Sequence, residues 1–173
     1  MGQIPFNFPY KPGSQVDGYA GLGPKGQATR ALGGALYNFG YGLSYTTFEY
    51  SDIELSPKYL MPDQPLKVSF TLKNTGARSG DEVVQLYLHD RTSSITVYDM
   101  MLRGFKRVHL APGESKTITM TLEPEAFEML DRNMKRVIEP GYFDIFIGSS
   151  STDLRLGATV AQLDPSDPEK YKK

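Results

Sequence analysis

The sequence predicts an all-β fold in which two antiparallel sheets pack as a sandwich. Three observations lead to this prediction. Segments that alternate apolar and polar residues recur between residues 48 and 161, turns rich in Pro and Gly separate them, and almost no stretch has the 3.6-residue period of a helix. The length of this region is close to the ~100 residues that such sandwiches use.

The first expected strand covers residues 48–55. It is followed by the connection SPKYLMPDQP, which contains Pro57, Pro62 and Pro65. Because proline has no N–H to donate to a neighbouring strand, this connection is not expected to form a central strand.

Residues 66–74 and 82–90 alternate regularly. In LKVSFTLKN the apolar residues occupy every second position, as in a half-buried strand, and Asn74-Thr75-Gly76 ends the pattern. EVVQLYLHD repeats the alternation. The residues expected to face the core are Leu66, Val68, Phe70, Leu72, Val84, Leu86 and Leu88, and those expected on the opposite face of the second strand are Val83, Gln85 and Tyr87.

Four more strands are expected after residue 100. Residues 103–110 and 116–122 are predicted to form a hairpin across the turn at residues 111–114. A single helical turn is expected within residues 124–130, since Pro124 suits a first helical position. The last strands are expected at residues 142–150 and 154–160, joined by the turn GSSST, and the polar end is expected to be frayed.

This series of strands favours an immunoglobulin-like or fibronectin-type-III-like topology, with a jelly roll as the alternative. The chain then divides into three parts. Residues 1–47 form an extension and linker, which is rich in Gly, Pro and aromatic residues; residues 48–161 form the sandwich; residues 162–173 form a polar tail.

The composition excludes several function classes. With 19 Lys and Arg against 20 Asp and Glu, the formal net charge is -1, so the chain has no basic excess for nucleic-acid binding. No apolar run approaches the roughly 20 residues of a membrane span, and no membrane partner is expected. The absence of cysteine excludes thiolate catalysis and leaves the cellular compartment open.

Carboxylate pairs do not indicate a catalytic site. Asp81 and Glu82 are neighbours in an expected strand, where adjacent side chains point to opposite faces. Asp131 and Glu139 flank an expected hairpin and are better placed to act together, but the basic residues between them offer pairing partners. We therefore expect no catalytic residues in this chain.

The two histidines do not indicate a metal site. His89 and His109 both fall near strand ends, and neither belongs to a cluster of acidic or sulfur ligands at metal-binding spacing. The glycines of GYAGLGPKGQ lack the context of a phosphate-binding loop. We therefore expect surface histidines, no bound metal and no cofactor.

The aromatic segment, residues 37–47 (YNFGYGLSYTT), has an unusual composition. Tyrosine can stack on a sugar ring and donate a hydrogen bond, so one interpretation is a carbohydrate groove. Against it, the chain has no tryptophan, and the glycines indicate tight bends that bring the backbone against a neighbour. Packing against another surface is the favoured interpretation.

Four stretches in order carry a family resemblance: FGYGLSYTTFEYSDIELS, VSFTLKNTGARSGDEVVQLYLHD, LRGFKRVHLAPGESKTITMTL and VIEPGYFDIFIGSSSTDLRL. They resemble the C-terminal fibronectin type III-like domain of glycoside hydrolase family 3 enzymes, the β-glucosidase and β-xylosidase group. The opening GQIPFNFPYKPGS resembles the end of the preceding α/β domain of that family, which would make this chain an excised fragment.

The resemblance implies a non-catalytic structural module. In this family the two carboxylates of the retaining mechanism, about 5 to 5.5 Å apart, lie in earlier domains, so the parent is implied to be a retaining glycoside hydrolase while this chain is not an enzyme. The family's usual location implies a periplasmic or secreted parent. One departure is that Val97 and Tyr98 stand where the family often has Arg and Pro, so the loop at residues 90–101 is expected to take its own course.

The resemblance gives the aromatic segment an expected role, which is contact with the catalytic domains of the same parent chain. The residues expected in this interdomain contact are Tyr37, Phe39, Gly40, Tyr41, Gly42, Leu43 and Tyr45. A carbohydrate-binding module and a protein-binding or adhesion sandwich are the alternatives. A homodimer through the exposed linker is a further possible partnership.

Overall fold

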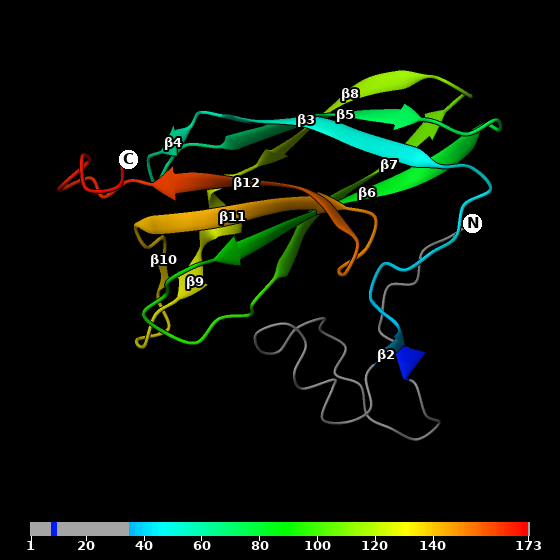
Figure 1. The fold of residues 1–173 in the computed structure, drawn as a ribbon. Helices are drawn as coiled ribbons and strands as arrows, with labels where there is room; N and C mark the ends of the chain where they lie inside the picture. Colours follow the sequence, from blue (N-terminus) through cyan, green and yellow to red (C-terminus); the bar gives the residue numbers. More distant parts are fainter. Residues whose placement is uncertain (1–7, 10–34, 173) are drawn as a thin grey trace.

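The computed structural model describes residues 8–9 and 35–172, and two facing β-sheets form most of this part (Figure 1). One sheet has the order β4-β12-β11-β6-β7 and the other β3-β5-β8. Pairing within both is antiparallel apart from the short contact of β12 with β4. The predicted all-β sandwich is confirmed.

The strands of the sandwich follow the alternating segments of the sequence. Their bounds are β3 (Phe48–Ser56), β4 (Tyr59–Leu60), β5 (Leu66–Asn74), β6 (Gly80–Asp90), β7 (Met101–Leu110), β8 (Ser115–Leu122), β11 (Gly141–Gly148) and β12 (Leu154–Gln162). The expected single helical turn is present as a 3₁₀ turn at Pro124–Phe127. Two short pairs lie outside the sandwich: β1 (Phe8–Pro9) with β2 (Ala35–Tyr37), and β9 (Met129–Leu130) with β10 (Arg136–Val137).

The core lies between the two sheets and is built from the inward-facing residues of each strand. All seven side chains that the alternation assigned to the core are buried. Gln85 and Tyr87 differ from the expectation, because both are buried although they lie on the outer face of β6. Part of the reason is local: Gly40 packs on the Gln85 side chain, and the Tyr87 hydroxyl donates a hydrogen bond to Gln85 Oε1.

The predicted hairpin of residues 103–110 and 116–122 is wrong. β7 pairs with β6 in one sheet and β8 pairs with β5 in the other, so the turn at residues 111–114 crosses between the sheets. The turn is anchored to the end of β5, because Asn74 N–H donates to Glu114 O and Gly113 N–H donates to Asn74 O. The crossing lets Leu110 and Ile118 face the same core from opposite sheets.

The polar end is more ordered than the sequence suggested. Leu163 is buried, and its N–H donates to Leu60 O at 2.7 Å. Farther along, the ring of Tyr171 meets that of Tyr142 edge to face, with centroids 5.7 Å apart. Aromatic and main-chain contacts therefore hold this end on the sandwich, at the opposite end from the aromatic segment (Figure 1).

The aromatic segment connects β2 to β3.

The expectations for residues 1–7 and 10–34 lie outside the described residues, and the division into linker, sandwich and tail stays a prediction. The described part contains no helix that is long and apolar enough to cross a membrane.

Candidate functional site

The aromatic segment begins with a tight turn. Tyr41 N–H donates to Asn38 O at 3.0 Å, and Gly40 has a φ of 82°, a value that glycine adopts far more readily than other residues. The turn brings the rings of Tyr37 and Tyr41 into a stack, with centroids 4.7 Å apart and planes inclined by 30°. The segment therefore presents a paired aromatic surface.

The same turn is attached to the sandwich. Phe39 O accepts a hydrogen bond from Ser151 N–H at 3.0 Å, and Gly40 is buried. A Cβ at Gly40 would overlap the amide of Gln85, which itself donates to Ser149 O at 2.7 Å. Glycine is thus required here both for its φ and for the close approach.

The residues expected in an interdomain contact fall into two groups. Phe39 and Gly40 lie against the chain's own sandwich. The large exposed side chains of the segment are Tyr37, Tyr41, Leu43 and Tyr45, and Gly42 is also exposed. Leu43 keeps 59% and Tyr45 74% of its surface in solvent, so the apolar surface of the segment points away from the core.

Asn74 fixes the place where the aromatic segment joins the sandwich. Its side chain is fully buried, and its Oδ1 accepts from Thr46 Oγ1 at 2.6 Å and from Gly76 N–H at 3.0 Å. Its Nδ2 donates to Arg78 O at 2.8 Å and to Leu110 O at 3.1 Å. One side chain therefore ties together the segment, the β5–β6 turn and the end of β7.

A second set of hydrogen bonds between the aromatic segment and the sandwich lies beside Asn74. Thr75 N–H donates to Thr47 O at 2.9 Å, and the hydroxyls of Thr75 and Thr47 lie 2.9 Å apart. A Cβ at Gly76 would overlap Thr46 Oγ1. The Asn74-Thr75-Gly76 stretch thus both ends β5 and holds the last residues of the aromatic segment.

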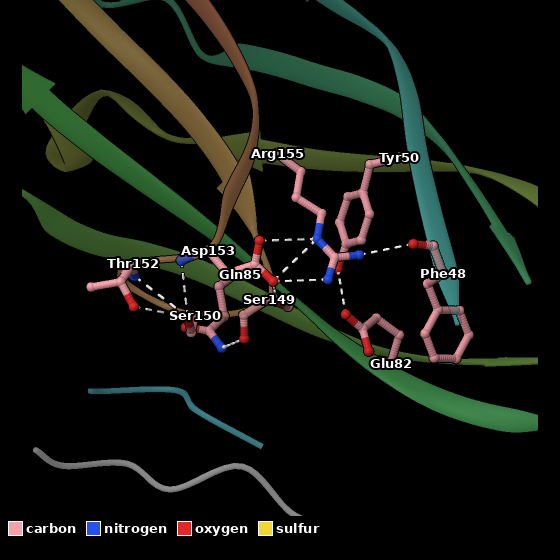
Figure 2. A network of polar contacts seen from close by, with 9 residues as sticks. All are labelled: Phe48, Tyr50, Glu82, Gln85, Ser149, Ser150, Thr152, Asp153 and Arg155. Atoms are coloured by element: carbon pink, nitrogen blue, oxygen red, sulfur yellow. Dashed lines mark hydrogen bonds and ion pairs between the residues drawn. The ribbon is translucent and has the colours of Figure 1, made fainter. Parts of the chain in front are cut away.

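A buried polar pair joins the two sheets near this junction (Figure 2). The hydroxyl of Tyr50, on β3, donates to Glu82 Oε1, on β6, at 2.7 Å. Burial raises the pKa of both groups, and the carboxylate's proximity adds to the rise at Tyr50. Each polar group thereby gains a partner in a site shielded from water.

Arg155 closes the open side between β12 and β3. Its guanidinium lies 5.0 Å from the centroid of the Tyr50 ring, donates to Phe48 O at 2.8 Å and pairs with Asp153 at 2.8 Å (Figure 2). The hydrogen bond from Arg155 lowers the pKa of Asp153. The charge is therefore held in place by a carboxylate, a carbonyl and an aromatic face.

A groove of about 510 Å³ opens at this end of the sandwich, and we call it the junction groove. The aromatic segment and the start of β3 form one side, β6 and β7 another, and the β11–β12 turn with the start of β12 the third. Its lining residues are Gly42, Leu43, Ser44, Thr46, Thr47, Phe48, Asp81, Glu82, Val83, Arg107, Ser149, Asp153 and Arg155.

The rim of the junction groove is charged and internally paired. Arg107 forms an ion pair with Asp81, and His109 Nδ1 lies 2.8 Å from the same carboxylate. The hydrogen bonds from Arg107 and His109 hold the pKa of Asp81 below its usual value. The rim therefore offers hydrogen-bonding groups whose charges are already balanced.

The carboxylates considered for catalysis are used in other ways. Asp81 and Glu82 both line the junction groove but have different partners, since Asp81 pairs with Arg107 on the rim and Glu82 is buried against Tyr50. Asp131 Oδ1 accepts from the N–H groups of Asn133 and Lys135, both at 2.8 Å, and Glu139 Oε2 accepts from Ser94 N–H at 2.8 Å. Both members of the second pair thus accept hydrogen bonds from main-chain N–H groups, Asp131 within its own turn and Glu139 from a loop 45 positions away.

The histidines serve local structure. His109 is exposed beside Asp81, and His89 Nδ1 lies 2.5 Å from Asp99 O. Among the described residues, no group of three or more His, Cys, Asp or Glu side chains is arranged to hold a metal ion.

The sequence interpretation missed the residues that hold the junction. The sequence pattern indicates only that Asn74 ends a strand and that Arg155 lies in the last strand. Glu82 carried a usable signal, because it shares the parity of Val84, Leu86 and Leu88 and so falls on the inward face of β6. A carboxylate at a core position needs a buried partner, and Tyr50 supplies it.

Comparison with known proteins identifies the fold family. Residues 82–151, which include β6, β7, β8 and β11, match the model of the fibronectin type III-like domain. Residues 82–151 therefore belong to a fibronectin type III-like domain. The matched residues include β7 and most of β6, which form one side of the junction groove. The aromatic segment, Asn74 and Arg155 lie outside the matched residues.

Similar domains occur within larger enzymes. The chain is 39% identical to a putative beta-xylosidase of Formosa agariphila over 90% of its length, and 42% identical to a periplasmic beta-glucosidase of Salmonella typhimurium over 72%. These matches span only 19% and 16% of the two relatives. The fibronectin type III-like domain here thus corresponds to less than a fifth of each.

Solved structures give the same result. The beta-glucosidase of Listeria innocua in complex with glucose matches with a TM-score of 0.71 and 36% identity, over 88% of this chain and 20% of that one. The GH3 beta-glucosidase of Bifidobacterium adolescentis matches with a TM-score of 0.69 and 29% identity, over 74% and 19%. The chain is a fibronectin type III-like module of the kind found in family 3 glycoside hydrolases.

Proposed function

We propose that this chain is the non-catalytic structural module of a larger family 3 glycoside hydrolase with β-glucosidase or β-xylosidase activity. The carrying observation is the partial coverage: similarity extends over most of this chain but only about a fifth of relatives named for those activities. Glu82, Asp131 and Glu139 each accept a hydrogen bond from a group within the chain, which supports a structural role.

The module contacts the catalytic part of the enzyme through the aromatic segment. Tyr37, Tyr41, Leu43 and Tyr45 supply the apolar contact, and Gly42 allows a close approach. Phe39 and Gly40 take a supporting part, because they fix the turn on the sandwich. Exposed tyrosines concentrated in one segment are typical of surfaces that become buried in a larger assembly.

A hydrolysis assay tests the proposal. Chromogenic β-glucosides and β-xylosides are offered to this chain alone and to the longer enzyme that carries it. Turnover by the longer enzyme alone is the expected result, and turnover by the purified chain would contradict a non-catalytic role. Replacing Tyr41 and Tyr45 by Ser in the longer enzyme is expected to lower its melting temperature, whereas unchanged melting and activity would contradict the contact.

Two other partnerships of the aromatic segment have their own measurements. The stacked pair Tyr37 and Tyr41 is the feature that favours carbohydrate binding. Saturable binding of soluble gluco- or xylo-oligosaccharides to the isolated chain, lost on Tyr41→Ala, would establish it. A sedimentation experiment over a range of concentrations would detect a homodimer formed through the segment.

A further inference from the structure

We propose that the junction groove is a docking site for a segment of the catalytic part of the enzyme, one that presents neutral main-chain and polar side-chain groups. This inference rests on the proposed function, since it takes the larger enzyme as given. The contact with the catalytic part would then involve not only the aromatic segment but also the sandwich, through Arg107, Arg155 and Val83.

The charges of the groove indicate a neutral occupant. Arg107 is paired with Asp81, and Arg155 with Asp153 and the Phe48 carbonyl. The third carboxyl group of the lining, that of Glu82, is buried and accepts a hydrogen bond from the Tyr50 hydroxyl. Because these charges are already balanced, a charged partner would have to break an existing pair, whereas a peptide group can share the hydrogen-bonding atoms that remain.

This surface shares arginines and tyrosines with protein interfaces, and its acidic residues, Asp81, Glu82 and Asp153, each have a partner within the chain. Arginine and tyrosine are enriched at interface centres and lysine is depleted. Arg107 and Arg155 line the groove, Tyr41 and Tyr45 are exposed on the adjoining segment, and no lysine is among the described residues of the lining.

The walls of the groove are fixed in place by interactions within the chain. The Thr46 hydroxyl donates a hydrogen bond to Asn74, and the hydroxyls of Thr47 and Thr75 share one. The Arg155 guanidinium donates a hydrogen bond to the carbonyl of Phe48. A surface that is already ordered loses less conformational entropy on binding than a mobile one. The groove is therefore prepared for an occupant that arrives in a fixed position.

Connectivity favours a segment of the same chain over a separate partner. One wall of the groove is the aromatic segment, through which the preceding chain enters the sandwich. Tethering at this point gives the preceding part of the enzyme a high local concentration at the groove. The lining is less suited to a sugar, because Tyr41 and Tyr45 lie outside it and Phe48 packs against the core.

Thiol labelling tests the docking directly. The chain has no cysteine, so Arg107→Cys supplies a single probe on the groove rim. Arg136→Cys is a matched control near the opposite end of the sandwich: the two arginine side chains are 72% and 74% exposed, and each forms one ion pair. Tyr45→Cys reports on the aromatic segment. Labelling by a maleimide is followed peptide by peptide by mass spectrometry.

In the isolated chain, Arg107→Cys and Arg136→Cys are expected to react at similar rates. In the longer enzyme, the reaction of Arg107→Cys is expected to slow by about tenfold or more, as for a thiol that becomes inaccessible, while that of Arg136→Cys is unchanged. Slowing at Tyr45→Cys without slowing at Arg107→Cys would overturn the docking and leave the proposed function standing. Slowing at neither position would contradict both.

Other outcomes identify a different occupant and would also overturn the inference. Slow reaction of Arg107→Cys in the isolated chain would place the occupant within this chain. Slowing that grows with protein concentration would indicate a second copy. Slowing caused by added xylo- or gluco-oligosaccharide would indicate a glycan site, and equal slowing at Arg107→Cys and Arg136→Cys would show shielding unrelated to the groove.

Discussion

The hydroxyl of Tyr50 lies 2.7 Å from the carboxylate of Glu82, and this hydrogen bond joins the two sheets of the sandwich. Both residues are buried, Tyr50 on β3, which follows the aromatic segment, and Glu82 on β6 of the five-stranded sheet. Arg155 covers the Tyr50 ring on its outer side. The pair therefore links the packing of the core to the junction groove.

Removing the Tyr50 hydroxyl is expected to destabilise the module. Tyr50→Phe leaves the buried Glu82 carboxylate without its donor, so we expect a loss of about 1–3 kcal/mol in the free energy of unfolding, measured by urea denaturation. Tyr45→Phe is the control, because Tyr45 is exposed, and it should change stability by less than about 0.5 kcal/mol. Equal effects of the two changes would show that the pair contributes nothing.

Glu82 is expected to give the module a pH dependence. Burial raises the pKa of Glu82 from 4.5, so the folded state binds this proton more tightly than the unfolded state does. Stability should therefore fall as pH rises from the ordinary pKa through the raised one. Glu82→Gln removes this ionisation, so its stability relative to the native chain should increase over that interval. A constant difference between the two urea midpoints from pH 4 to pH 8 would contradict the assignment.

Asn74 is expected to hold the aromatic segment and the sandwich together. Asn74→Ala leaves its buried partners unpaired and should cost about 2 kcal/mol or more. It should also speed hydrogen exchange of the Thr75 amide, which donates to Thr47. Asn133→Ala is the matched control at an exposed turn and should change stability by less than about 0.5 kcal/mol. Unchanged exchange at Thr75 in Asn74→Ala would refute the role.

The close approach at Gly40 is testable against a second glycine. Gly40 and Gly113 both have positive φ, but only at Gly40 would an added Cβ meet a neighbour, the Gln85 amide. Gly113→Ala should lose roughly 1–2 kcal/mol from backbone strain alone. Gly40→Ala should in addition separate the turn from the sandwich. This would break the hydrogen bond from the Ser151 amide to Phe39 O, so hydrogen exchange of that amide should become faster. Retained protection of that amide would contradict the packing.

The assignment of β6 residues to the core can be tested by replacing one buried and one exposed leucine. Leu86 is fully buried, so Leu86→Ala should cost about 2–5 kcal/mol. Leu43→Ala, at an exposed position of the aromatic segment, should change the stability of the isolated chain by less than about 0.5 kcal/mol. A denaturation midpoint unaffected by Leu86→Ala would reject the register.

Much of the fold follows from the sequence because burial on one face imposes a period of two on a strand. The core positions of β5 and β6 could be read from that period, as Phe70 and Leu86 illustrate. The pairing of β7 could not be predicted from the sequence, because the alternation of its residues is compatible with a partner strand in either sheet. The main-chain bonds of Asn74 to the turn at residues 111–114 place β8 in the other sheet.

The candidate site was less predictable than the fold, since it depends on contacts between residues distant in the sequence. Asn74 meets Thr46 from 28 positions away and Leu110 from 36. No local pattern marks an asparagine for such a role. The composition of the aromatic segment singled out residues that line the junction groove, but it did not indicate that Gly40 packs against the chain's own Gln85.

The two ends of the described sandwich point in opposite directions. The aromatic segment enters at one end, whereas Leu163 and Tyr171 hold the last described residues at the other (Figure 1). An affinity tag, fluorophore or surface anchor attached after residue 172 would therefore be carried far from the junction groove. A module immobilised in this way would keep the junction groove turned toward solution, which suits binding measurements at that groove.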